Sequence, residues 1–226
     1  MFKKIGNLFS GNGGRGEGSP ADMGRPAGAP PTPAARLRPM ASYSALDGSF
    51  REAELTEKLA NLYVKLQNGW TDKDIEPLKP YLAEDFYARM DRQLDQLRRR
   101  KQTNYVDRIA VLGVVLKGFF QEAGEDHIIA ELRTRIVDYT MDDETCEVVS
   151  GDRRREKFMT YEWNLARPSG TQTGQKSGVS RSLCPACGAP LDVNAGARCP
   201  YCGSVAGGNG EWVLCSIRGL AQQTGN

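Results

Sequence analysis

Apolar residues recur at helical spacing in two stretches of the first half of the chain. Leu55, Leu59, Leu62 and Leu66 are spaced to share one face of a helix, which we expect over residues 50–67 and ending at Gly69. A second helix is expected over residues 81–101. Its apolar face consists of Leu82, Phe86, Met90, Leu94 and Leu97. The basic run at 98–101 suits the end of this helix, because positive charge is favourable at a helix C-terminus.

The pattern then changes to the two-residue period of β-strands. Residues 109–120 are β-branched or aromatic on both faces, so we expect a central strand there. Residues 127–139 alternate, with Ile128, Ala130, Leu132, Thr134 and Ile136 on one face. Residues 155–167 alternate as well, with Met159, Tyr161, Trp163 and Leu165 facing inward. Helices followed by hairpin-linked strands predict an α+β domain, in which helices cover one face of a curved antiparallel sheet to form a cone with an open mouth.

Composition divides the chain into five parts. Residues 10–43 are rich in Gly and Pro and contain few large apolar side chains, so we expect residues 1–48 to be a disordered arm. The α+β domain is expected over 49–168, followed by a polar linker over 169–182. We expect a small C-terminal ribbon over 183–218 and a tail over 219–226. A segment this short needs a metal or disulfides to fold, because it cannot bury enough apolar surface.

The ribbon contains two CPxCG motifs, within the sequence CPACGAPLDVNAGARCPYCG. Four cysteines in this spacing provide the tetrahedral thiolate set that zinc prefers, and the glycine after each pair permits the tight turn of a zinc knuckle. The predicted ligands are Cys184, Cys187, Cys199 and Cys202. A closed four-sulfur site has no position for substrate, so we expect one structural Zn²⁺. A redox dithiol pair and an iron–sulfur site are the alternatives. We expect residues 211–217 to be a third ribbon strand, with Cys215 as a buried thiol or a spare ligand.

Charge and hydropathy limit the location and partners of the protein. Thirty basic and 28 acidic residues give a net charge of +2, which argues against a dedicated nucleic-acid binder. The longest apolar run, residues 109–116, is far shorter than the roughly 20 residues of a membrane helix. We see no signal peptide and expect a cytoplasmic protein. Residues 1–9 place apolar side chains at helical spacing beside two lysines, which suggests a short anchor peripheral to the inner face of a membrane. The basic runs at 98–101 and 153–155 are candidate contacts to anionic lipid.

The sequence contains little that indicates a catalytic site. The only histidine, His127, lies in a polar run that we expect to be an exposed turn. Asp138 and Asp152 are expected to cap or to form ion pairs. No nucleophile lies in a pattern that would supply it with a base. We therefore expect a protein that is not an enzyme.

Four segments resemble a known family. They are Gly69-Trp70 with Asp74, the helical sequence LAEDFYARMDRQLDQLRRRKQTNYVDRI, the segment VDYTMDDETCEVVSGD, and the strand FMTYEWNLAR. Over about residues 50–217 they look like the domain of the mitochondrial import subunit TIM-forty-four, whose bacterial relatives include members with a CPxCG ribbon. Cys146 departs from the pattern, because a glycine is expected in that turn.

The resemblance implies a nuclear-transport-factor-two-like cone and a non-enzymatic adaptor or scaffold. Protein partners, a link to protein transport and membrane association are implied by the same resemblance, whereas the anionic membrane surface is expected from residues 1–9 and the two basic runs. One alternative is a small-ligand binder or enzyme that uses the cavity of the cone. A second alternative is a nucleic-acid-binding ribbon, but residues 183–217 contain only one basic residue, Arg198, and we expect Tyr201 and Trp212 to form the ribbon core.

Overall fold

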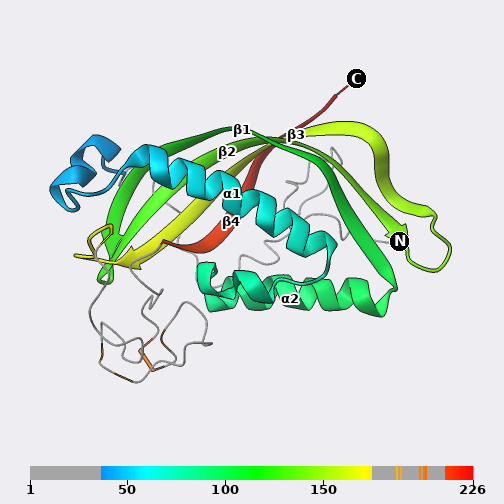
Figure 1. The fold of residues 1–226 in the computed structure, drawn as a ribbon, viewed down its shortest axis with the longest axis horizontal. Helices are drawn as coiled ribbons and strands as arrows, with labels where there is room; N and C mark the ends of the chain where they lie inside the picture. The colour runs from blue at the N-terminus through cyan, green and yellow to red at the C-terminus, as the bar shows by residue number, and fades with distance from the viewer. Residues whose placement is uncertain are drawn as a thin grey trace, which may run out of the picture.

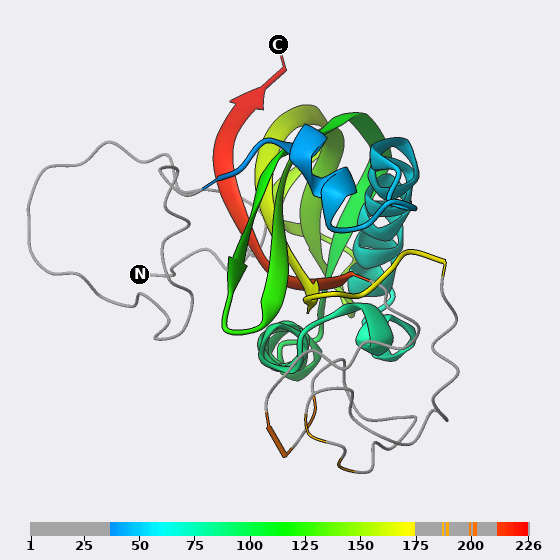
Figure 2. The same ribbon diagram turned by 90° about the vertical axis from the view of Figure 1, so that its left-hand side faces the viewer.

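The computed structural model describes residues 37–174 and 212–225, together with residues 187, 189, 199, 201 and 202. The elements are η2 (Met40–Ala45), α1 (Glu52–Thr71), η3 (Glu76–Tyr81), α2 (Glu84–Arg99), β1 (Gln102–Glu122), β2 (Glu125–Asp142), β3 (Val148–Pro168) and β4 (Val213–Thr224). The strands form one antiparallel sheet in the order β1-β2-β3-β4. The sheet is curved, and α1 lies along its hollow with α2 beside it (Figures 1 and 2). The predicted α+β class is confirmed.

Both helices bury most of the predicted apolar positions, although Leu62 is only partly buried and Leu82, which is buried, precedes α2. In α1 the side chains of Leu55, Leu59 and Leu66 are buried, as are Phe86, Met90, Leu94 and Leu97 in α2. The expected end of the first helix at Gly69 is wrong, because α1 continues to Thr71. Gly69 has another role, since a Cβ at that position would lie 2.7 Å from the carbonyl oxygen of Asp74. The glycine therefore allows the chain after α1 to fold back closely on the helix.

The sheet confirms the alternation of β2 and β3 but corrects the position of β1. Ile128, Ala130, Leu132, Thr134 and Ile136 are buried, as are the four inward residues predicted in β3. The expected central strand is instead an edge strand, in which Leu112 and Val115 are 51% and 50% exposed. Near its end this edge is covered, because Arg38 and Phe119 exchange backbone hydrogen bonds of 2.8 and 3.0 Å. Three register shifts interrupt the pairing of β1 with β2, and such bulges discourage pairing of an edge with other chains.

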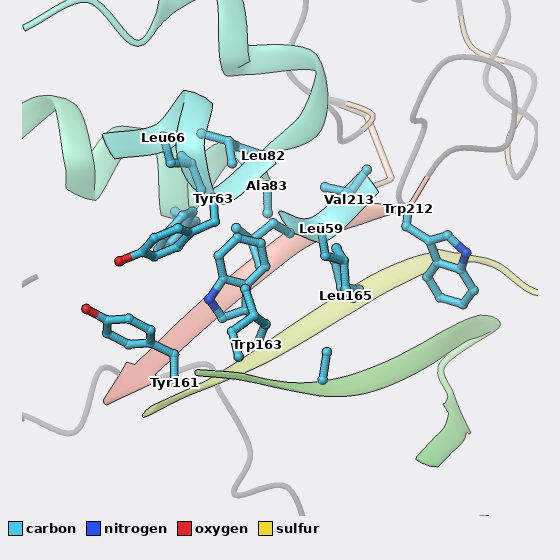
Figure 3. Packing of buried hydrophobic residues seen from close by; sticks show 14 of the residues in the cluster. Leu59, Tyr63, Leu66, Leu82, Ala83, Tyr161, Trp163, Leu165, Trp212 and Val213 are labelled. Atoms are coloured by element: carbon cyan, nitrogen blue, oxygen red, sulfur yellow. The ribbon is translucent and has the colours of Figure 1, made fainter. Parts of the chain in front are cut away.

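Aromatic side chains fill the space between α1 and the sheet. Tyr63 of α1 faces Tyr161 and Trp163 of β3, with ring centroids 5.8 and 6.3 Å apart (Figure 3). All three side chains are fully buried. This part of the cone interior is therefore packed with side chains.

The structure places two segments differently from the expected domain boundaries. Residues 37–48, expected in the disordered arm, pack on the domain, where Tyr43 and Asp47 are completely buried. Residues 213–224, expected in the ribbon and tail, form β4 and pair with β3. The CPxCG segment is therefore an insertion between β3 and β4. Residues 1–36, including the proposed anchor, and the linker residues 175–182 lie outside the described residues. Within the described part, no helix combines the length and apolar character needed to cross a membrane.

Candidate metal centre and buried polar clusters

Three of the four predicted metal ligands lie together. The sulfur atoms of Cys187, Cys199 and Cys202 are all within 4.8 Å of one another. The Sγ atoms of Cys187 and Cys199 are 3.8 Å apart. Four sulfurs at about 2.3 Å from a tetrahedral zinc ion are about 3.8 Å from each other, whereas a disulfide bond measures about 2.05 Å. The described sulfurs are thus spaced as ligands of one metal ion, and Cys184 lies outside the described residues.

The expected surroundings of this cluster need correction. Residues 213–217 belong to β4, so they do not form a third ribbon strand. Cys215 is half-buried against the domain core, and its Sγ lies 3.6 Å from the carbonyl oxygen of Val213, which supports a packed thiol over a spare ligand. Trp212 also belongs to the domain core, and Tyr201 is 69% exposed, so neither forms the expected ribbon core.

Both ends of the insertion are held at one buried guanidinium group. Arg167, at the end of β3, forms an ion pair with Asp47 at 2.7 Å, and the two side chains are 1% and 0% exposed. Before the insertion, Thr173 accepts a hydrogen bond from Arg167 and donates its hydroxyl to Asp47 at 2.6 Å. After the insertion, the ring of Trp212 lies 4.5 Å from the Arg167 guanidinium carbon. Residues on both sides of the insertion therefore contact the same buried side chain of the domain.

Tyr43 completes this cluster and links it to β2. Its hydroxyl donates to Asp126 at 2.6 Å and accepts from Arg167 at 2.9 Å. Burial, followed by the hydrogen bond to Asp126, raises the pKa of Tyr43 well above its usual range. Burial acts to raise the pKa of Asp47, but hydrogen bonds from Thr173 and Arg167 outweigh it and lower that pKa. Tyr43 is thus neutral and Asp47 charged at neutral pH, and both side chains hold the guanidinium of Arg167 in place.

A second set of polar contacts involves two aspartates of the segment VDYTMDDETCEVVSGD, Asp138 and Asp152. The carboxylate of Asp138 accepts hydrogen bonds from Asn104 at 2.8 Å and from Lys157 at 2.5 Å. Asp152 caps a turn by accepting the backbone N–H groups of Arg154 and Arg155. Both predictions for these carboxylates, an ion pair and a cap, are confirmed.

Glycine is required within the same segment. Gly151 has a φ of +82°, and a Cβ there would lie 2.4 Å from the Asp138 carbonyl oxygen. Cys146 has a φ of 58°, the left-handed conformation in which a glycine was expected. The chain tolerates a non-glycine residue in this turn, and the hairpin still forms.

His127 lies in β2 and not in the exposed turn that we expected. The turn is formed by Ala123 and Gly124, which have φ values of 50° and 80°. The ring of His127 stacks on Phe120 at 4.6 Å, and its Nδ1 lies 3.1 Å from Asn164 Oδ1. Its Nε2 lies 3.6 Å from a Glu125 carboxylate oxygen. The contacts at this histidine are those of a packed side chain.

Arg167 is the important residue that the sequence analysis missed. The period of two through Met159, Tyr161, Trp163 and Leu165 continues to Arg167, so the alternation already pointed this charge inward. A charged residue at an inward position of a strand signals a buried partner, because an isolated buried charge is very unfavourable. The partner, Asp47, could not be recognised because it lies in a segment expected to be disordered.

Comparison with known proteins adds one positive finding. The sequence model of a family described as Tim44-like domain matches residues 38–176, which cover more than half of the chain. The match begins at Arg38, the residue whose backbone pairs with Phe119. No curated protein matches the chain.

Proposed function

The chain belongs to the Tim44-like domain family, and from that premise we propose that it is a non-enzymatic adaptor with a structural zinc ion. In this proposal the domain binds protein partners at a membrane surface in a process linked to protein transport. The match to the family model is the observation that supports the adaptor role. The sulfur geometry supports the zinc ion.

The packing of the domain supports an adaptor over a protein that binds a small ligand inside the cone. Tyr63, Tyr161 and Trp163 occupy the space between α1 and the sheet, and each is fully buried. Burial raises the pKa values of Tyr63 and Tyr161, so both hydroxyl groups are neutral at neutral pH. Asp138 and His127 are engaged by neighbouring side chains. None of these groups is arranged as a general base beside a nucleophile.

In the proposed metal site, the thiolates of Cys187, Cys199 and Cys202 bind the ion with Cys184 as the fourth ligand. The ion organises a segment that has too few apolar residues to fold alone. Elemental analysis of the purified chain should find one zinc per chain. The variant Cys187→Ser should lose it, whereas the matched variant Cys146→Ser, at an exposed cysteine remote in sequence from the motifs, should retain it. Zinc retained by Cys187→Ser would refute this assignment.

The adaptor role is tested by crosslinking in the native host, followed by mass spectrometry. The comparison must remove only the insertion, because truncation from residue 183 would also delete β4 and damage the sheet. Residues 176–209 are therefore replaced by a short Gly-Ser linker, and intact β4 is verified by circular dichroism. Protein partners that are recovered with the intact chain and lost with this variant support an adaptor that recognises them through the metal segment. Recovery of no specific protein with either chain would refute the adaptor role.

A further inference from the structure

The structure separates two basic runs that look equivalent in the sequence. In the run at 98–101, Arg98 forms ion pairs with Asp91 and Asp95. Lys101 forms an ion pair with Glu144. Half of this run is therefore neutralised within the molecule.

The run at 153–155 is compensated less, by the adjacent carboxylate of Asp152. All three arginines are exposed, and among the described residues none of them forms an ion pair. Two acidic residues of the adjacent hairpin turn already have other partners, because Asp143 pairs with Lys73 and Glu144 with Lys101. The adjacent carboxylate of Asp152 accepts the backbone N–H groups of Arg154 and Arg155 and offsets part of the charge of the three arginines. Three arginines against the one carboxylate of Asp152 therefore leave an excess of positive charge at residues 152–155 of β3.

A bulge in β3 carries these arginines. The pairing of β2 with β3 skips residues 152–155, because Tyr139 pairs with Gly151 and Val137 with Glu156. Gly151 and the cap formed by Asp152 define the shape of the bulge. Arg153 is further fixed over the ring of Tyr139, at 5.4 Å from its centroid. Figure 1 shows this first part of β3, in yellow-green, arching away from the helices.

Apolar side chains precede the arginines on the same strand. Val148 and Val149 are 40% and 49% exposed. We propose that residues 148–155 form a docking surface for an anionic lipid bilayer, with arginines at the headgroups and valines at the interface. Charge and apolar surface together match a bilayer boundary. A single-stranded nucleic acid would require accessible aromatic faces, but Tyr139 is only 5% exposed beneath Arg153. This inference rests only on the membrane component of the proposed function.

The test measures cosedimentation of the intact chain with vesicles of phosphatidylcholine alone or with roughly one third phosphatidylglycerol, at low and at physiological ionic strength. The test variant is Arg153→Gln/Arg154→Gln/Arg155→Gln. The control is Arg89→Gln/Arg98→Gln/Lys101→Gln, which changes the net charge equally but removes residues that are ion-paired. If each arginine contributes as basic residues near anionic membranes usually do, the test variant should bind on the order of 100-fold more weakly. The control should bind within about threefold of the intact chain, and salt should weaken binding.

Several outcomes would overturn the proposal. They are no binding by the intact chain, equal losses in the two variants, and binding that persists in the test variant but disappears when residues 1–10 are deleted. Displacement of the intact chain from vesicles by a single-stranded RNA oligonucleotide at equal charge concentration would indicate that the surface binds nucleic acid instead of lipid. The zinc content and the protein crosslinks of the test variant are measured as well. These two measurements distinguish failure of the lipid-docking proposal from failure of the proposed adaptor role.

Discussion

Two ion pairs of equal length allow a direct measurement of what burial contributes in this fold. Arg167 lies 2.7 Å from Asp47, with side chains 1% and 0% exposed. Arg218 lies 2.7 Å from Glu162, with side chains 65% and 22% exposed. Arg167→Met leaves a buried carboxylate without its cation and should reduce the free energy of unfolding by about 3–5 kcal/mol. Arg218→Met should reduce it by less than about 1 kcal/mol, because water replaces the lost partner.

Urea denaturation of the zinc-saturated protein, followed by far-ultraviolet circular dichroism, is the appropriate assay. Tryptophan fluorescence alone is unsuitable because Trp212 contacts Arg167 directly. Adding Asp47→Asn to Arg167→Met removes the orphaned charge and should recover part of the lost stability. Equal losses for Arg167→Met and Arg218→Met, or no recovery in the double variant, would refute the argument from burial.

The same pair predicts a dependence on pH. The pKa of Asp47 is lowered in the folded chain, so its contribution to stability is present above its unfolded pKa of about 3.9 and is lost as the pH falls through the lower folded value. In Arg167→Met, burial without the guanidinium should instead raise the pKa of Asp47. The difference in stability between this variant and the intact chain should therefore shrink as the pH approaches 4. A difference that is constant from neutral pH to about pH 4 would contradict this mechanism.

Three further predictions concern backbone conformation and the metal. Gly151→Ala should destabilise the domain by more than Gly124→Ala in thermal unfolding, because both residues have positive φ but only at Gly151 would the Cβ meet backbone atoms. Cys146→Gly should raise the free energy of unfolding by about 0.5–1 kcal/mol in urea, since glycine adopts the observed φ without strain; destabilisation would be contrary evidence. A strong chelator should remove the protection of the inserted segment from hydrogen exchange, while β4 stays protected. Loss of the metal lengthens the free loop between β3 and β4, and even a twofold change in loop length alters stability by only about 0.6 kcal/mol. Loss of protection in β4 would show that the metal segment supports the sheet directly.

Local patterns in the sequence predicted both long helices, most of the strand segments and the direction of most of their side chains. The leucine stripe of α1 and the inward residues of β2 and β3 follow from helix and strand periodicity, which depends only on backbone geometry. The spacing of the CPxCG motifs likewise predicts the metal ligands, because the thiolates of a knuckle are close in sequence. The Tim44-like resemblance also came from the sequence, and the family match confirms it.

Tertiary structure decided which distant segments meet. The apolar pattern of residues 211–217 suits a ribbon strand or a strand of the main sheet equally well, and only its pairing with β3 distinguishes the two. The apolar character of β1 suggested a central strand, but its position at the edge depends on which strands it pairs with. The residues around Asp47 do not indicate that it is buried. Its partner in the buried ion pair, Arg167, is far away in sequence. Periodicity determines which way a side chain points, whereas pairing energies between remote segments determine what it points toward.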